Sequence, residues 1–242
     1  MYNFKLNKKG VMLEFLVGVL LAILIFTPTC LFTAKIFRLS QQGQDSFQDF
    51  AAEIKDLETV KAGKEAIRIS VLTLDEQTAW VYFQPDYKET LLKISPATDY
   101  KKQAEVYFER PSACPEGSNC LCLFQKYEIN GAAGAPTPFA HVIAESPSCS
   151  VLSLRLYLSV TDGVEHSCSL GTPGLYRPTY SCPQGFVIER GLVQKVVREV
   201  QLDGEYGYLN NDRRVTINLL KSPSDSSVLL TPEIPVPPTS KK

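Results

Sequence analysis

The sequence predicts an α+β protein, in which a long N-terminal transmembrane helix continues into an amphipathic helix packed on a mostly antiparallel β domain. Three observations predict this plan. Residues 15–34 contain no charged side chain, residues 38–62 repeat apolar side chains at helical spacing, and residues 63–221 alternate in the manner of strands. The chain has 242 residues, of which 44% are hydrophobic and 21% charged, so its composition is that of a folded protein.

The uncharged segment has the length of a membrane span. A helix of about twenty residues rises roughly 30 Å, the thickness of the hydrocarbon core of a bilayer. No small-residue cleavage site of a secretory signal follows the segment. We therefore expect one transmembrane helix over residues 11–37. Lysines in the leader, residues 1–10, predict a single-pass protein of the cell membrane with a cytoplasmic N-terminus and an extracellular body.

The next segment, residues 38–62, has the pattern of an amphipathic helix. Phe47, Phe50, Ile54 and Leu57 recur at spacings of three and four, while Gln, Asp and Glu occupy the other positions. We expect the membrane helix to continue through this segment and to pack its apolar stripe against a domain.

The β domain is expected over residues 63–221. Residues 67–83 predict two strands around a turn at 75–77, because β-branched and aromatic residues alternate there. Further strands are predicted at 103–108, 121–128, 151–159, 185–190, 193–201 and 213–220. Residues 222–242 are rich in proline and serine, and we expect them to form an extended, flexible tail.

Six cysteines in the β domain predict a disulfide framework and therefore an oxidising compartment. They are Cys114, Cys120, Cys122, Cys149, Cys168 and Cys182. Cys120 and Cys122 point the same way on a strand, so each needs a partner elsewhere. A pair between Cys168 and Cys182 is our first candidate, although six cysteines allow fifteen pairings. A metal site with His166 is the alternative, but the paired spacing of structural zinc sites is absent from the sequence.

Nothing in the sequence predicts an enzyme, a cofactor or a metal. The only histidines, His141 and His166, lie in no nucleophile or metallohydrolase signature. Asp162 and Glu165 accompany His166 in a segment that is typical of a solvated turn. The leader apart, acids outnumber bases, and no basic stripe is present, so we expect no nucleic-acid binding.

The N-terminus nevertheless resembles a known signal. Lys8, Lys9 and Gly10 precede a hydrophobic helix that carries Glu14 and Phe15 near its start. This arrangement resembles the class III (prepilin-type) signal of type IV pilins and archaeal pilin-like proteins. Pro28 within the helix is similar to the helix-kinking proline of type IV pilins. The resemblance covers residues 5–60.

The resemblance implies cleavage by a prepilin-type peptidase. The cut would fall after Lys9 or after Gly10, which leaves Gly10 or Val11 as the new N-terminus. Cleavage after Gly10 would make Glu14 the fourth residue of the mature chain, whereas pilins usually have this glutamate fifth.

The resemblance also implies an assembly contact. Glu14 would pair with the amino group of a neighbouring pilin-like subunit, with Phe15 and Pro28 in the same helical packing. The alternative for Glu14 is that its carboxylate only reaches the inner headgroups. A minor pilin or pseudopilin is the expected function, in an adhesive surface filament or its assembly or secretion machinery, as a homo- or hetero-oligomer. The competing hypothesis is a monomeric single-pass exoprotein whose β domain binds a ligand or a protein.

Overall fold

The computed structural model describes residues 8–61, 64–95, 103–132, 139–158, 179–199, 213–223 and 226–232. Within helix α1 (Lys8–Thr59), the described side chains are those of residues 16–24, 26 and 42–59. The chain divides into two compact units, residues 1–42 and residues 43–242, and each is described by itself.

The first unit contains the N-terminal part of α1. Its exposed large apolar side chains lie between Leu16 and Phe26. Over the described part of the chain, no helix combines the length and the apolar character that crossing a membrane requires. The predicted transmembrane helix over residues 11–37 is therefore corrected, and with it the prediction of a single-pass membrane protein.

The second unit is mainly β, and the predicted α+β plan built on a membrane helix is wrong for the same reason. Its strands form three sheets, which we name A, B and C. In spatial order, sheet A contains β1 (Ala66–Thr73), β12 (Arg214–Lys221), β13 (Ser227–Pro232) and β9 (Arg155–Leu158). Sheet B contains β11 (Gly185–Arg190), β2 (Thr78–Phe83), β5 (Asn119–Phe124) and β8 (Ser148–Leu152). Sheet C contains β10 (Thr179–Ser181), β3 (Glu89–Ser95), β4 (Ala104–Glu109), β7 (Phe139–Ala144) and β6 (Tyr127–Ala132).

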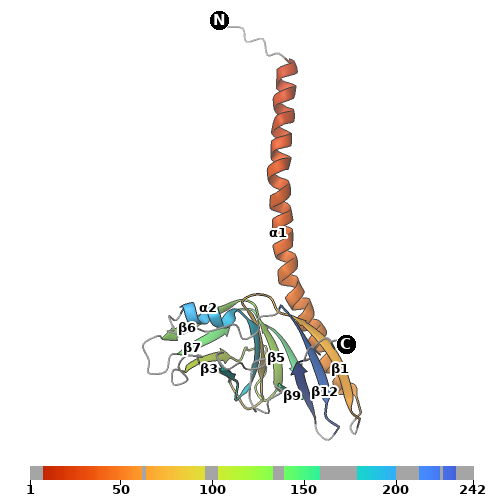
Figure 1. Ribbon diagram of the computed structural model, residues 1–242, viewed down its shortest axis with the longest axis vertical. Coiled ribbons are helices and arrows are strands. Elements are labelled where there is room, and N and C mark those ends of the chain that lie inside the picture. Colours follow the sequence, from red (N-terminus) through yellow and green to blue (C-terminus); the bar gives the residue numbers. More distant parts are fainter. Residues whose placement is uncertain are drawn as a thin grey trace, which may run out of the picture. The chain divides into compact units, whose positions relative to one another are not determined.

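Sheet B is the central layer of the domain. Alternate residues of a strand face opposite sides, and β2 shows both sides buried. Val81 and Phe83 belong to a hydrophobic cluster shared with sheet C, whereas Trp80 and Tyr82 belong to a second cluster shared with sheet A and α1. Sheets A and C therefore lie on opposite faces of sheet B. Figure 1 shows this order from β3, β6 and β7 through β5 to β9, β12 and β1.

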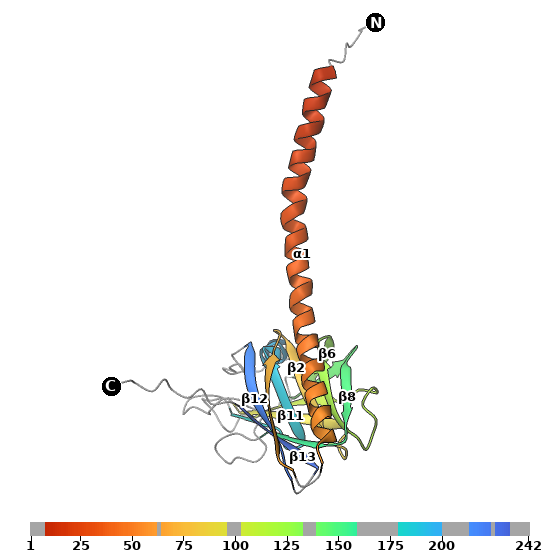
Figure 2. The same cartoon turned by 90° about the vertical axis from the view of Figure 1, so that its right-hand side faces the viewer.

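The C-terminal part of α1 belongs to this domain and completes the layer formed by sheet A (Figure 2). The predicted apolar stripe is confirmed, because Phe47, Phe50, Ile54 and Leu57 are all buried in the cluster shared with sheet B. Phe47 and Phe50 pack on Trp80, with ring centroids 5.5 and 5.4 Å from its ring.

Side chains join α1 to sheet A at both ends of the contact. The Ser46 hydroxyl accepts a hydrogen bond from Thr73 N–H (2.8 Å) and lies 3.4 Å from the Val71 carbonyl oxygen, which satisfies groups on the edge of β1. At the end of the helix, the Lys221 ammonium donates to the carbonyl oxygens of Leu57 and Val60, both at 2.7 Å. Carbonyls at a helix C-terminus lack intrahelical donors, so this buried cation caps α1.

Most of the predicted strands are confirmed, and two segments are corrected. The pair predicted at 67–83 corresponds to β1 and β2, and 185–190 corresponds to β11. Residues 193–201 were expected to form a strand, but they begin within helix α2 (Leu192–Glu199), which buries Leu192, Val193 and Val196 on one side. The expected flexible tail contains β13, which pairs with β12 and β9.

Candidate functional site

The predicted disulfide framework is confirmed in part. Two bonds join pairs of described cysteines, Cys114–Cys120 and Cys122–Cys149. Cys120 and Cys122 thus bond to separate partners, as strand alternation predicts. Cys182 is also disulfide-bonded, and its predicted partner Cys168 lies outside the described residues. These bonds indicate an oxidising environment for the domain.

The residues of the class III signal lie in or next to α1. The structure does not describe their side chains, so the predicted cleavage and assembly contacts remain predictions. The residues concerned are Lys8, Lys9, Gly10, Val11, Glu14, Phe15 and Pro28. Asp162, Glu165 and His166 also lie outside the described residues. His141 lies on β7, where its ring stacks on Tyr107 at 5.0 Å and its Nδ1 is 3.4 Å from a Glu109 carboxylate oxygen.

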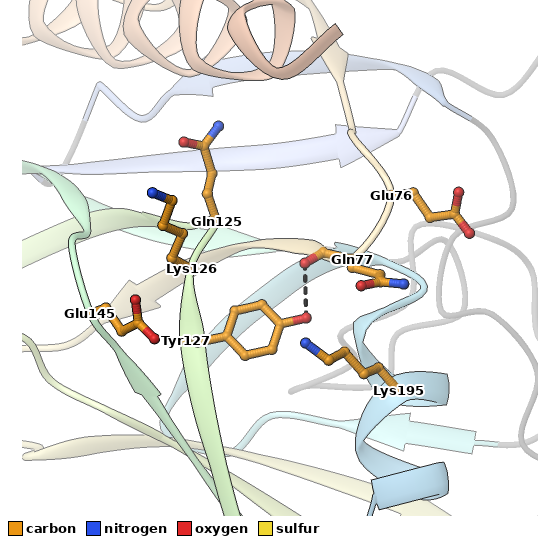
Figure 3. A pocket seen from close by; sticks show the side chains of 7 residues that line it. All are labelled: Glu76, Gln77, Gln125, Lys126, Tyr127, Glu145 and Lys195. Atoms are coloured by element: carbon orange, nitrogen blue, oxygen red, sulfur yellow. Dashed lines mark hydrogen bonds between the residues drawn. The ribbon is translucent and has the colours of Figure 1, made fainter. Parts of the chain in front are cut away.

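A polar pocket of about 340 Å³ lies where the β1–β2 turn, the β5–β6 turn and α2 meet (Figure 3). It is lined by Glu76, Gln77, Gln125, Lys126, Tyr127, Glu145 and Lys195. Gln77 has a φ of 61°, a left-handed conformation that is uncommon for residues other than glycine. Its N–H donates to the Arg190 carbonyl (2.7 Å), and its own carbonyl accepts from the Tyr127 hydroxyl (3.0 Å).

Tyr127 holds the elements of this pocket together. The Lys195 ammonium lies over its ring, 4.5 Å from the centroid, which is a cation–π geometry. Burial, followed by the negative charges of Glu189 and Glu199, raises the pKa of the Tyr127 hydroxyl. The hydroxyl is thus a neutral donor already bonded to a backbone carbonyl. This is the chemistry of a structural clamp rather than of an acid or a nucleophile.

Among the described residues, no group of three or more His, Cys, Asp or Glu side chains is arranged to hold a metal ion. The pocket offers charged and amide groups for polar contacts. Surfaces, rather than pockets, carry the more distinctive chemistry of the domain.

The outer face of sheet A presents apolar side chains to solvent. The strand registers place Ile67, Leu220, Leu229 and Tyr157 side by side across all four strands. Ile67 is 59% exposed and Tyr157 is 45% exposed, at the two ends of this row. A solvent-facing antiparallel sheet normally presents polar side chains, so this row is unusual.

The apolar surface extends along the edge strand β1, where Ile69 is 62% and Val71 is 54% exposed. We call the whole outward surface of sheet A face A. Face A consists of Ile67, Ile69, Val71, Thr73, Arg155, Tyr157, Arg214, Thr216, Asn218, Leu220, Ser227, Leu229 and Thr231. Its ionisable side chains, apart from Tyr157, are two arginines, and it contains no carboxylate.

A second pocket of about 340 Å³ adjoins face A. Arg155, Tyr157 and Ser227 belong both to this pocket and to face A, and Asn119, Ser153 and Ser226 complete the lining. The apolar row therefore ends in a hollow that contains a guanidinium group. A partner's acidic side chain could be received there, because arginine pairs well with carboxylates.

The outer face of sheet C has the opposite charge. The registers of β3, β4, β7 and β6 place a common set of residues outward, which we call face C: Glu89, Lys93, Glu105, Tyr107, Glu109, Glu128, Asn130, Phe139, His141 and Ile143. Four of these residues are glutamates, against one lysine. Tyr107, Phe139 and His141 form an aromatic centre, because the Phe139 and His141 rings also pack edge to face at 5.9 Å.

Comparison of the chain with protein-family models, with curated proteins and with solved structures finds no match. The resemblance of the N-terminus to type IV pilins is thus unsupported by any family match, and it is overturned because the required membrane helix is not found in the described part of the chain. The function must therefore be inferred from the geometry of the domain.

Sequence reasoning missed both outward faces. The signal for face A was present in the alternation of Ile67, Ile69 and Val71, but Ser70 and Leu72 occupy the other side of the same strand. With apolar residues on both sides, the sequence does not indicate which side is buried. Face C could not be foreseen because β3 and β7 were not predicted as strands.

Proposed function

We propose that the protein is a non-catalytic subunit of a protein assembly in an oxidising compartment, and that its β domain binds another protein through face A. The observation that carries this proposal is the apolar row of face A, whose ends Ile67 and Tyr157 remain exposed although the domain has two well-packed hydrophobic clusters. Exposed apolar patches of this kind are typical of protein interaction sites.

The charges of face A define the chemistry of the partner. Arg155 and Arg214 lie outside the apolar row, and no carboxylate lies among the outward residues. A complementary surface has an apolar centre and acidic side chains around it. Such complementarity contributes specificity and a faster association rate.

The size of face A indicates a modest affinity for each contact. Four strands about 4.8 Å apart, of up to eight residues at about 3.4 Å each, give a flat area on the order of 500 Å². A standard stable interface buries about 800 Å² on each partner. Face A therefore suits a weak contact, or one that is repeated within an assembly.

Photo-cross-linking tests the proposal. A benzophenone amino acid would replace Ile69 in the full chain, expressed in the organism that produces it. We expect adducts with a protein whose cross-linked surface is acidic. The same residue at Glu116, an exposed position in the β4–β5 loop, is the control. Equal or absent labelling at both positions would contradict the proposed function.

A further inference from the structure

The two outward faces of the domain are complementary to each other. Face A combines an apolar row with arginines, whereas face C combines an aromatic centre with an excess of glutamates. Because sheets A and C lie on opposite sides of sheet B, the two faces point away from each other (Figure 1). One copy cannot bring its own two faces together.

We infer that the partner of face A is face C of a second copy of this chain. This inference rests on the proposed function and names its partner. A contact between two different faces is heterologous, and each added copy leaves one face A and one face C unoccupied. Face-to-face packing of this kind therefore adds copies in one direction and produces a linear assembly rather than a closed dimer.

The aromatic centre of face C provides the apolar half of the contact. Tyr107 and His141 stack with an interplanar angle of 17°, and Ile143 faces the same way on the strand that carries His141. This group has a counterpart in the row of face A that runs from Ile67 to Tyr157. Side chains of two packed sheets interdigitate at about 10 Å, which such rows allow.

The charges of face C provide the polar half. Glu89 and Glu109 are directly opposite each other on β3 and β4, an arrangement that is destabilising in the absence of a cation. Lys93 lies 3.4 Å from Glu105 and is the lysine of face C against four glutamates, so face C has an excess of carboxylates. Arginines from face A would correct this imbalance.

Symmetric pairing is disfavoured by the same charges. Two copies of face A would bring four arginines together without a carboxylate. Two copies of face C would bring eight glutamates together with only two lysines. Like charges placed across an interface suppress association, so the heterologous contact is the favoured one.

Charge reversal tests the inference on the full chain. The first variant carries Arg155→Glu and Arg214→Glu on face A, and the second carries Glu109→Lys and Glu128→Lys on face C. We expect each variant alone to self-associate about 100-fold more weakly than the wild type. Sedimentation velocity at low ionic strength measures this association. A parallel series contains a nonionic detergent, which removes any association through the exposed apolar side chains of α1. These side chains are unchanged in every variant.

Mixing the two variants provides the decisive measurement. Each retains one unaltered face, so an equimolar mixture brings an unaltered face A against an unaltered face C and restores association. The matched controls are Lys126→Glu with Lys88→Glu, and Glu76→Lys with Glu116→Lys, which make the same changes in net charge at exposed positions outside both faces. Near-ultraviolet circular dichroism verifies that every variant is folded.

The outcomes separate the inference from the proposed function. Unchanged association in both variants, or a mixture that stays dissociated, would overturn the self-partner. A wild-type chain that remains monomeric while position 69 cross-links to a different protein would also overturn it, and would leave the proposed function intact. Loss of association in the single-face variants with recovery in the mixture supports the heterologous contact.

Discussion

Lys221 on β12 and Leu57 in the last turn of α1 are 164 residues apart in the chain, yet the ammonium of one lies 2.7 Å from the carbonyl oxygen of the other. The same ammonium is bonded to the carbonyl of Val60. A single buried lysine thus fixes the C-terminal end of α1 to sheet A.

The first prediction concerns this cap. Lys221→Met keeps the apolar stem but removes a charged donor from two carbonyls, so we expect the free energy of unfolding to fall by about 3 kcal/mol. Urea denaturation followed by circular dichroism measures the change. The control is Arg68→Met, which removes an exposed ion pair with Asp56 at 3.2 Å and is expected to cost less than about 1 kcal/mol. Similar losses in both variants would contradict a capping role for Lys221.

A second prediction concerns Tyr82, whose hydroxyl donates to Asn119 Oδ1 (2.7 Å) and accepts from Leu156 N–H (3.1 Å). Burial raises the pKa of Tyr82 to about 12, from an ordinary value of 10.0. Because the pKa of Tyr82 is raised in the folded state, the contribution of Tyr82 to stability is fully present below pH 10. Stability is then lost as the pH rises to about 12, because the unfolded chain ionises first.

The shift corresponds to about 2–3 kcal/mol between those pH values. We expect Tyr82→Phe to be less stable than the wild type at neutral pH by about 1–3 kcal/mol, and to lose less further stability between pH 10 and 12. Denaturation at a series of pH values measures both effects. Parallel curves for the two proteins would argue against this role of Tyr82.

The third prediction concerns Gly185 at the start of β11. Its φ is +151°, and an added Cβ would lie 2.2 Å from the Tyr82 carbonyl oxygen. Gly185→Ala therefore requires the backbone of β2 or β11 to move, and we expect a loss of more than about 2 kcal/mol. Gly117→Ala is the matched control, because Gly117 has a φ of +76° but nothing within 4 Å of the added Cβ. Its expected cost is about 1 kcal/mol. Equal costs would show that the close approach to Tyr82 is unimportant.

The fourth prediction ranks the disulfides Cys122–Cys149 and Cys114–Cys120. Cys122 and Cys149 are 27 residues apart, whereas Cys114 and Cys120 are 6 apart. In the chain-entropy treatment, closing these loops contributes about 3.5 and about 2 kcal/mol respectively. Replacing the first pair by alanines is thus expected to lower the denaturation midpoint more than replacing the second pair. The reverse order would indicate that the bonds act mainly through the native packing of the domain.

The sequence alone was sufficient for the elements with a regular and one-sided pattern. The stripe of Phe47, Phe50, Ile54 and Leu57 predicted its own burial, and the alternating run at 67–83 predicted β1 and β2. In these segments the local preference and the final packing agree. The alternation of Cys120 and Cys122 likewise predicted that they bond to different partners.

Other features depend on contacts that no local pattern reveals. The valines of α2 favour a strand by intrinsic preference, but Val193 and Val196 lie one helical turn apart and are buried together. Glu189 accepts hydrogen bonds from the N–H groups of Leu192 and Val193, which starts the helix. The serine- and proline-rich composition after residue 221 concealed β13, which pairs with the preceding strand β12 and with the distant strand β9.

The position of β13 also sets the order in which the domain is made. This strand, from the last described segment of the chain, lies between β9 and β12, and β12 in turn pairs with β1 from the beginning of the domain. A chain that is still being synthesised lacks the centre of sheet A, so Leu57 and Ile54 lack part of the hydrophobic cluster that buries them. Sheet A is therefore complete only after β13 has been made, and until then the unfinished chain exposes apolar side chains that the folded domain buries.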